Sequence, residues 1–144
     1  MVRLREDCQF RSSRLDVGAW DGSLAKERSA FVGPDDKDAT TLRARSLSTG
    51  ESIGLLILFE EPLANTDRAA LRIGYLITEA ARGQGFATEL VTGFVEWCRK
   101  RPWVASISGG VEPDNVASAV VLTRTGFVLQ VNARVDVEEF LLEL

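Results

Sequence analysis

One turn in the sequence carries residues suited to binding a phosphate group. Residues 82–88 read Arg-Gly-Gln-Gly-Phe-Ala-Thr and lie where a predicted strand gives way to a long predicted helix. Gly83 and Gly85 leave room for a ligand to approach the backbone, and the first N–H groups of a helix have no partners within it. Together with the helix dipole and the positive charge of Arg82, these groups predict an anion site.

Three general interpretations of this turn compete. The first is an ordinary structural connection between a strand and a helix, which any glycine-containing turn can provide. The second is a dinucleotide-binding turn, but Thr88 stands where that motif has its third glycine, and the motif belongs near the start of a parallel sheet. The third, a Walker phosphate loop, is excluded because no Gly-Lys-Ser/Thr sequence follows.

The composition excludes several other chemistries. The chain has 144 residues and no histidine, which removes Ser-His-Asp catalysis, Cys-His catalysis and any zinc site that contains histidine. Cys8 and Cys98 are too far apart for a CxxC pair, so we expect free thiols, with Cys98 buried on a helix. With 17 basic and 21 acidic residues the net charge is −4, which argues against nucleic-acid binding through a basic surface.

The length and the distribution of apolar residues favour one domain over residues 1–144. Apolar residues make up 45% and charged residues 26%, as in soluble globular proteins. No apolar run is long enough for a transmembrane helix, and the N-terminus lacks the apolar core of a signal peptide. We therefore expect a cytoplasmic protein that has no membrane partner.

The order of the predicted elements is that of a mixed α/β domain. Strands are predicted by apolar runs or alternation at residues 13–19, 40–47, 52–60, 70–77, 103–111, 127–132 and 135–144. Helices are predicted from Ser23, as the N-cap, to Phe31 or Val32, at residues 85–100, and at residues 115–124 with Asp114 as the N-cap. The turn at 48–51 predicts a hairpin, and residues 33–38 are expected to form a loop.

The glycine-rich turn and its surroundings resemble the GNAT superfamily of acetyl-CoA-dependent N-acetyltransferases. Residues 82–87 are similar to its Arg/Gln-x-x-Gly-x-Gly/Ala motif, and Ile-Gly-Tyr-Leu at 73–76 precedes the motif as the family's fourth strand does. The Pro-x-Asn-x-x-Ser pattern within 111–118 resembles the branch that acetylates ribosomal-protein N-termini, and Thr-Gly-Phe at 125–127 closes the next helix. The resemblance covers about residues 40–132 and implies a mixed, mostly antiparallel sheet flanked by helices.

The resemblance also implies a site for acetyl-CoA and no metal. In this family the pyrophosphate lies on the turn after the fourth strand, the pantetheine arm pairs with that strand's backbone, and an Asn contacts the arm. The positions carried over are Leu76, Ile77, Thr78, Arg82, Gly83, Gln84, Gly85, Phe86, Ala87, Thr88 and Asn115. An alternative for Asn115 is that it only helps Asp114 to start the helix.

The catalytic residues are less completely matched. In the reaction that the resemblance implies, an amine attacks the thioester directly. A strand N–H near Leu76 holds the thioester carbonyl, and the leaving thiolate needs a proton. Leu122 stands where many members carry the Tyr that supplies this proton, and Tyr75, the only tyrosine, lies elsewhere in the sequence. Ser118 is therefore the candidate acid, unless its hydroxyl bonds its own helix backbone.

The acceptor side departs from the family's pattern. Arg72 stands where relatives often carry a Glu, and arginine cannot accept a proton at neutral pH. Glu60, Glu61 or a chain of waters could act as the base instead.

Residues 20–39 have room for one helix instead of the family's usual two, so the N-terminal helical region is shortened. The acceptor cleft is then either more open or completed by a second subunit. Trp20 and Phe31 could line this cleft, although a place in the core is favoured for both.

The sequence predicts an N-acetyltransferase that moves acetyl from acetyl-CoA to a primary amine. The acceptor is a protein N-terminus, a lysine or a small-molecule amine, and the chain acts as a monomer or a homodimer. One alternative is a GNAT-fold module that binds CoA with little or no transfer activity. A second is a nucleotide-binding fold that uses the same turn for NAD or ATP.

Overall fold

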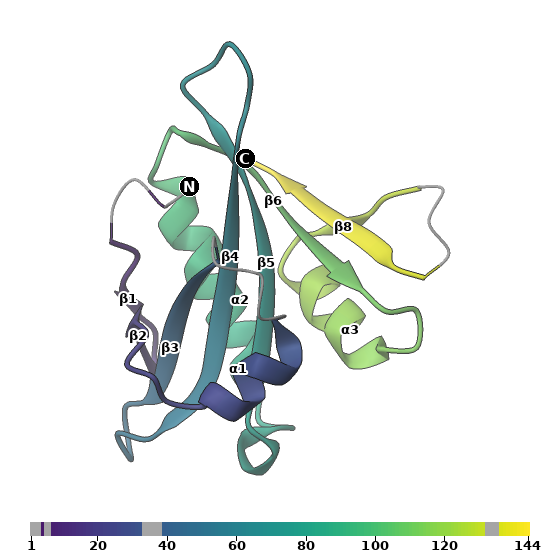
Figure 1. Cartoon of the computed structure of the whole chain (residues 1–144). Helices are drawn as coiled ribbons and strands as arrows, with labels where there is room; N and C mark the ends of the chain where they lie inside the picture. Colours follow the sequence, from purple (N-terminus) through teal and green to yellow (C-terminus); the bar gives the residue numbers. More distant parts are fainter. Residues whose placement is uncertain (1–3, 5–6, 33–38, 132–135) are drawn as a thin grey trace.

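The computed structural model describes residues 4, 7–32, 39–131 and 136–144 as one sheet with helices on both faces (Figure 1). The strands are β1 (Phe10–Arg11), β2 (Leu15–Ala19), β3 (Thr40–Ser46), β4 (Ser52–Pro62), β5 (Ala69–Ile77), β6 (Val104–Val111), β7 (Val128–Leu129) and β8 (Glu138–Glu143). The helices are α1 (Ala25–Phe31), α2 (Phe86–Arg99) and α3 (Val116–Arg124), with a short 3-10 turn η1 (Glu79–Ala81).

The strand order in the sheet is β1-β2-β3-β4-β5-β6-β8-β7. All neighbouring strands are antiparallel except β5 and β6, which are parallel. A parallel pair needs a crossover connection, and α2 provides it. This arrangement confirms the predicted mixed, mostly antiparallel sheet.

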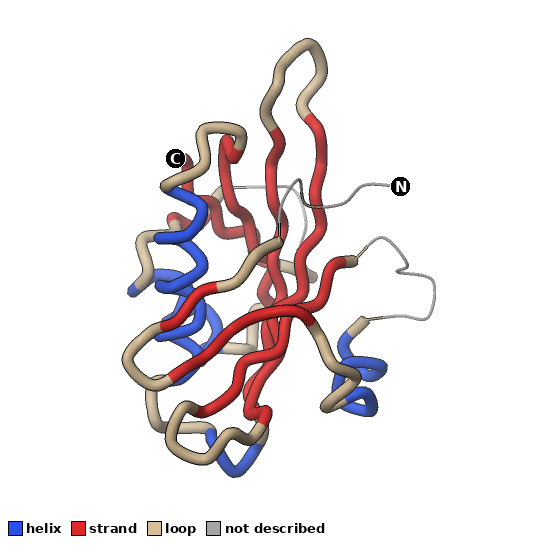
Figure 2. Tube along the Cα trace, turned by 90° about the vertical axis from the view of Figure 1, so that its left-hand side faces the viewer, coloured by secondary structure: helices blue, strands red, loops and turns tan. Residues whose placement is uncertain are grey.

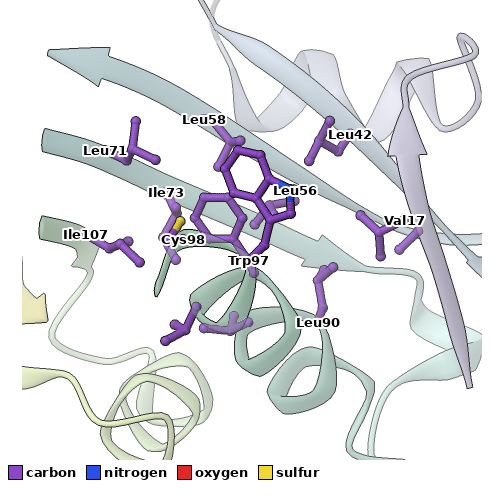
Figure 3. Packing of buried hydrophobic residues seen from close by; sticks show 14 of the residues in the cluster. Val17, Leu42, Leu56, Leu58, Leu71, Ile73, Leu90, Trp97, Cys98 and Ile107 are labelled. Carbon is purple, nitrogen blue, oxygen red and sulfur yellow. The ribbon is translucent and has the colours of Figure 1, made fainter. Parts of the chain in front are cut away.

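The main core lies between the sheet and α2 (Figure 3). The apolar side chains of α2 recur every three to four residues, so one face of the helix is buried on the sheet. Trp97 and Cys98 on this face pack toward Leu58, Leu71 and Ile73 of the two central strands. The predicted burial of Cys98 is confirmed, and burial raises the pKa of its thiol above the ordinary value.

The helices divide between the two faces of the sheet (Figure 2). Helices α2 and α3 cover one face, and α1 lies against the other. Helix α1 has seven residues and none of them is buried, so this second face is only partly covered in the described chain.

Strands β5 and β6 separate part of the way along their length. Their pairing runs from Ala69 opposite Val104 to Ile73 opposite Gly109 and then stops. Beyond this point β5 continues beside β4 as far as Ile77, while the end of β6 pairs only with β8. The two parallel strands therefore open into a V, which Figure 1 shows as the widening gap between their lower parts.

Two of the predicted helix caps are wrong. Asn115 rather than Asp114 caps α3, because the backbone of Asp114 already closes a tight turn with the N–H of Val116. Ser23 does not cap α1, because its hydroxyl bonds Ser52 in β4 at 2.9 Å. Leu24 occupies the cap position with φ +56° and no side-chain bond.

The remaining differences concern the ends of strands. The hairpin of β3 and β4 and the helix α2 lie where they are predicted. The first predicted strand starts only at Leu15, and a further two-residue strand, β1, precedes it. The strand predicted at 127–132 is limited to β7, and the last strand begins at Glu138. Residues 132, 135 and the predicted loop at 33–38 lie outside the described residues.

Candidate active site

The glycine-rich turn at residues 82–88, which we call the phosphate turn, has the backbone that an anion site requires. Gly83 and Gly85 have φ +78° and +82°, in the left-handed region that favours glycine. A side chain on Gly83 would meet nothing within 4 Å, so the backbone there is open to a ligand. The first helical bond joins Glu89 N–H to the Gly85 carbonyl, and no described residue accepts from the N–H groups of residues 86–88. Three donors therefore point out of the start of α2.

Arg14, in the segment before β2, contacts this turn and the first residues of α2. Its guanidinium bonds the Glu89 carboxylate at 2.7 Å and the Gln84 carbonyl at 2.9 Å, and lies 4.1 Å from the centre of the Phe86 ring. Sequence reasoning missed Arg14, because its partners lie 70 to 75 residues further along the chain and no local pattern marks it. Arg14 adds a second positive charge at the start of α2.

The Glu89 carboxylate accepts hydrogen bonds from the backbone and the side chain of Arg14. Burial acts to raise the pKa of its carboxyl, but hydrogen bonds from the Ser12 hydroxyl and from the side chain and backbone of Arg14 outweigh burial and lower the pKa. The carboxylate is therefore charged at neutral pH and fixes Arg14 beside the phosphate turn.

Arg82 ties the same turn to the end of β5. Its Nε donates to the Ile77 carbonyl at 2.9 Å. Arg82 also lines a groove of about 460 Å³, which we call the β5 groove. The groove is lined by the end of β5, the residues that follow it and one side of α1, namely Leu76, Ile77, Thr78, Glu79, Arg82, Glu27, Ala30 and Phe31. Four of the predicted cofactor residues thus line one groove.

The backbone of β5 is divided between β4 and the V-shaped opening. Thr78 N–H donates to the Ile53 carbonyl in β4 at 2.8 Å. Because backbone groups alternate sides along a strand, Leu76 also faces β4, whereas Tyr75 and Ile77 face the opening. Of the three residues predicted to pair with a pantetheine arm, Ile77 is the one that can do so through its backbone. Tyr75, which was not predicted, joins it.

A second cavity of about 470 Å³ lies beside the β5 groove, and we call it the Arg72 pocket. It is lined by strands β4, β5 and β6 and the end of α1, namely Phe31, Val32, Phe59, Glu61, Arg72, Ile73, Gly74 and Gly110. Of the two carboxylates considered as a base, Glu61 lines this pocket. Glu60 is not among its lining residues, and alternation along β4 directs the two side chains to opposite faces of the sheet.

Phe31 separates the β5 groove from the Arg72 pocket. It lines both, and its ring lies so close to Gly74 that a Cβ on this glycine would overlap it. The expectation that Phe31 belongs to the core is wrong, because 49% of the residue is exposed. Trp20 is half-buried, donates its indole N–H to the Ser23 carbonyl, and is not among the residues lining either cavity.

The predicted acid Ser118 lies beside the only tyrosine. The Tyr75 hydroxyl donates to the backbone carbonyl of Ser118 at 3.4 Å, which brings β5 and α3 together at the opening. Burial raises the pKa of Tyr75, and the contact with Ser118 opposes this shift. Among the described residues the Ser118 hydroxyl forms no hydrogen bond with the backbone of its own helix, so the alternative in which it bonds that helix is not observed. Leu122 is buried, with 1% exposed.

Asn115 has the structural role that the alternative interpretation gave it. Its Oδ1 accepts from the Ser118 N–H at 3.2 Å and so caps α3. This bond uses only the oxygen of the amide, and the NH2 group remains able to donate. A contact with a pantetheine arm stays a prediction.

Two other features are absent from the described parts of the chain, namely a cluster of metal-ligating side chains and a membrane-spanning helix. Residues 4, 7–32, 39–131 and 136–144 contain no group of three or more Cys, Asp or Glu side chains placed to hold a metal ion. None of the helices described there has the length and apolarity needed to cross a membrane.

Comparisons with known proteins agree with the fold. Residues 14–128 match the family model of the acetyltransferase (GNAT) domain. No curated protein is similar enough to the chain to count as a match. Among solved structures, an acetyltransferase from Agrobacterium tumefaciens has a TM-score of 0.72 at 19% identity, over 100% of this chain and 99% of its own.

Two further solved structures are ribosomal-protein acetyltransferases. A ribosomal L7/L12 alpha-N-protein acetyltransferase in complex with coenzyme A has a TM-score of 0.72 at 18% identity, over 92% of this chain and 96% of its own. A ribosomal-protein-S5-alanine acetyltransferase from Vibrio fischeri has a TM-score of 0.70 at 15% identity, over 95% and 97%. At these identities the likeness establishes the fold, whereas the family model spans most of the chain. The protein therefore belongs to the GNAT acetyltransferase family.

Proposed function

We propose that this protein transfers acetyl from acetyl-CoA to a primary amine. The observation that carries the proposal is the meeting of two cavities at Phe31. On one side the β5 groove leads to the phosphate turn, and on the other the Arg72 pocket opens beside the V between β5 and β6. A CoA-binding module would need only the first cavity.

The residues of the first cavity fit the parts of acetyl-CoA. The free N–H groups at the start of α2, with Arg82 and Arg14, suit a pyrophosphate. The backbone of Tyr75 and Ile77 suits a pantetheine arm that pairs as an added strand, and the Asn115 amide can donate to the arm. When bound, acetyl-CoA supplies the activated thioester.

The transfer needs one proton removed and one proton supplied. The amine nitrogen forms a bond to the acetyl carbonyl carbon while the carbon–sulfur bond breaks and the sulfur leaves as a thiolate. Glu61, in the Arg72 pocket, is the base that we propose for the amine proton, directly or through a water. Ser118 is the proposed donor to the thiolate, with the Tyr75 hydroxyl beside it as the second candidate.

The leading alternative is a CoA-binding module with little transfer activity. Two features support it, namely a buried leucine at position 122 and an arginine at position 72, where family members often carry Tyr and Glu. The presence of an open Arg72 pocket favours the enzyme, because a binding module has no use for an acceptor cavity.

Two measurements together decide between these functions. Calorimetric titration with acetyl-CoA, with NAD and ATP as controls, tests the phosphate turn. Release of free CoA thiol in the presence of amines then tests transfer. Binding of acetyl-CoA followed by thiol release is the expected result. Binding without release across protein N-termini, lysine and small amines would support the CoA-binding module, and binding of NAD or ATP instead would show that the phosphate turn takes a different nucleotide and would contradict the acetyl-CoA site.

The remaining expectations are proposals as well. We propose that the chain is one domain that acts in the cytoplasm, without a nucleic-acid or membrane partner, as a monomer or a homodimer. The net charge of −4 and the two cysteines without a disulfide support this proposal. Light scattering of the purified chain measures its oligomeric state.

A further inference from the structure

The Arg72 pocket contains an arginine whose guanidinium forms no hydrogen bond or ion pair with any residue that the structure describes. Several other arginines of the sheet and helices do have such partners, whereas the exposed Arg99 and Arg124 of the helices do not have one among the described residues. Arg28 donates to Thr41, and Arg45 pairs with Asp21 at 2.7 Å. A guanidinium carries five donors and a permanent charge, so Arg72 is a ready binding group for an anion.

The position of Arg72 places this charge at the V-shaped opening. Arg72 stands opposite Phe59 of β4 and Ser108 of β6, one pair before β5 and β6 separate. Its Nη2 lies 3.5 Å from the position that a Cβ on Gly110 would take. The guanidinium thus reaches over the end of β6, on the side of Phe31 away from the phosphate turn.

The other groups of the pocket limit what can bind there. Glu61 lines the same cavity, and Glu139 Oε2 lies 3.6 Å from the same Cβ position on Gly110, yet neither carboxylate is ion-paired with Arg72. The other walls are largely apolar, with Phe31, Phe59 and Val32. The pocket therefore combines a cation, an anion and apolar surface within one cavity.

We propose that the acceptor amine belongs to a molecule that also carries a carboxylate, and that Arg72 binds this carboxylate. The inference rests on the acetyl-transfer function proposed above. The acceptor amine then lies toward Glu61, and an apolar part of the acceptor packs on Phe31 and Phe59. Two sources offer this chemistry, namely the α-carboxylate of a free apolar amino acid and an acidic side chain next to a peptide N-terminus.

The test compares acceptors that differ only in the carboxylate. For the first source, L-phenylalanine is compared with L-phenylalaninamide. For the second source, two dipeptides with amidated C-termini are compared, namely alanyl-aspartate amide and alanyl-asparagine amide. Because a charge-assisted hydrogen bond contributes about 1.5–3 kcal/mol, kcat/KM for thiol release should be roughly 10- to 100-fold higher for the carboxylate member of the preferred pair. The pair that shows the difference identifies the source.

Substitution of the arginine provides the second arm. Arg72→Gln should remove the preference for the carboxylate member without changing acetyl-CoA affinity. Arg99→Gln is the matched control, because Arg99 is an exposed arginine of α2 outside the Arg72 pocket, and this variant should keep the full preference. Equal rates within both pairs for the unsubstituted protein, or a preference that survives Arg72→Gln, would overturn the inference.

A binding measurement separates failure of this inference from failure of the proposed function. N-acetyl-L-phenylalanine and its amide, and the two N-acetylated dipeptide amides, are titrated into the protein saturated with CoA. The carboxylate member of one pair should bind at least 10-fold more tightly, and Arg72→Gln should abolish this difference. Thiol release absent for every amine, with this difference present, would overturn the transferase and leave the carboxylate site standing. No difference in either pair would overturn the site whatever the enzyme does.

Discussion

At the scale of single residues, two hydroxyls compete for the same task. The Ser118 hydroxyl is not bonded to its own helix in the described chain, and the Tyr75 hydroxyl beside it donates to the backbone carbonyl of Ser118. We expect Ser118→Ala to lower kcat by about 100-fold, the low end of the range for losing a positioned acid, with acetyl-CoA affinity unchanged. Steady-state kinetics and calorimetry on the same preparation measure both quantities.

Tyr75→Phe is the matched comparison, because it removes one hydroxyl and keeps the ring. A smaller loss of kcat is expected for this variant. The opposite order, with Tyr75→Phe the more damaging, would contradict Ser118 as the acid and assign the proton to the phenol.

A glycine and an aromatic ring form the boundary between the two cavities. A Cβ on Gly74 overlaps the ring of Phe31, but this ring is half-exposed and can swing away. We expect Gly74→Ala to lower kcat/KM for the amine while changing the free energy of unfolding by less than about 1 kcal/mol. When Gly74→Ala is combined with Phe31→Ala, kcat/KM should be higher than the value expected if the two single losses multiplied. A double-mutant cycle measures this difference.

Gly54→Ala serves as the contrast for this prediction. A Cβ on Gly54 would lie 2.7 Å from the backbone oxygen of Leu76, and backbone cannot swing away. Gly54→Ala should therefore destabilise the protein more than Gly74→Ala does. Equal losses of stability would show that the Phe31 ring is held as firmly as the backbone.

At the scale of elements, the segment before β2 is joined to α2 by the contact between Arg14 and Glu89. Arg14 is 43% exposed at its side chain, so we expect Arg14→Ala to cost only about 1 kcal/mol of unfolding free energy in urea denaturation. The variant should also bind acetyl-CoA more weakly, because it loses a charge beside the phosphate turn. Arg11→Ala is the control, since Arg11 makes only a 3.8 Å pair with Asp16.

The pH dependence of this contact has a definite sign. The pKa of Glu89 is lowered from its ordinary value of 4.5, so the stabilisation is present above pH 4.5 and is lost as the pH falls below it. The stability difference between the unsubstituted protein and Arg14→Ala should therefore shrink at acidic pH. A difference that stays constant from pH 7 to pH 3 would mean that Arg14 acts through packing on Phe86 and not through charge.

The elements that were predicted well are those specified by local pattern. Apolar spacing fixed α2, and alternation with a glycine turn fixed the hairpin of β3 and β4. The phosphate turn was predictable for the same reason, because its glycines and the helix start are adjacent in sequence. The cap of α3 was missed by one residue, within the ordinary uncertainty of helix ends.

The features that were missed join segments far apart in the chain. Arg14 against the phosphate turn, Tyr75 against Ser118 and Phe31 over Gly74 each depend on how separate elements pack. Helix α1 buries none of its residues, so its weak pattern could not indicate which way Phe31 faces. The acceptor side of the site was therefore less predictable than the cofactor side.

At the scale of the whole molecule, the sheet that the eight described strands form connects both cavities, so the chain should unfold as a unit. Acetyl-CoA at about 100 times its Kd should stabilise the folded state by about 2.7 kcal/mol. For a chain of this length the corresponding rise in Tm is roughly 5 to 11 °C. Calorimetry of the free and saturated protein should show one transition in each case.

A substitution in the phosphate turn links this global property to the site. Gly85→Glu places a negative charge and a strained side chain where the pyrophosphate is proposed to lie, so the rise in Tm with acetyl-CoA should disappear. Gly50→Glu is matched to it, because Gly50 has φ +75° with open space around it, in the turn between β3 and β4. Both substitutions place a side chain at a positive φ and so introduce similar backbone strain, but only Gly50→Glu should keep the ligand-induced rise in Tm. Loss of the rise in both would assign the effect to general destabilisation and remove the phosphate turn from the acetyl-CoA site.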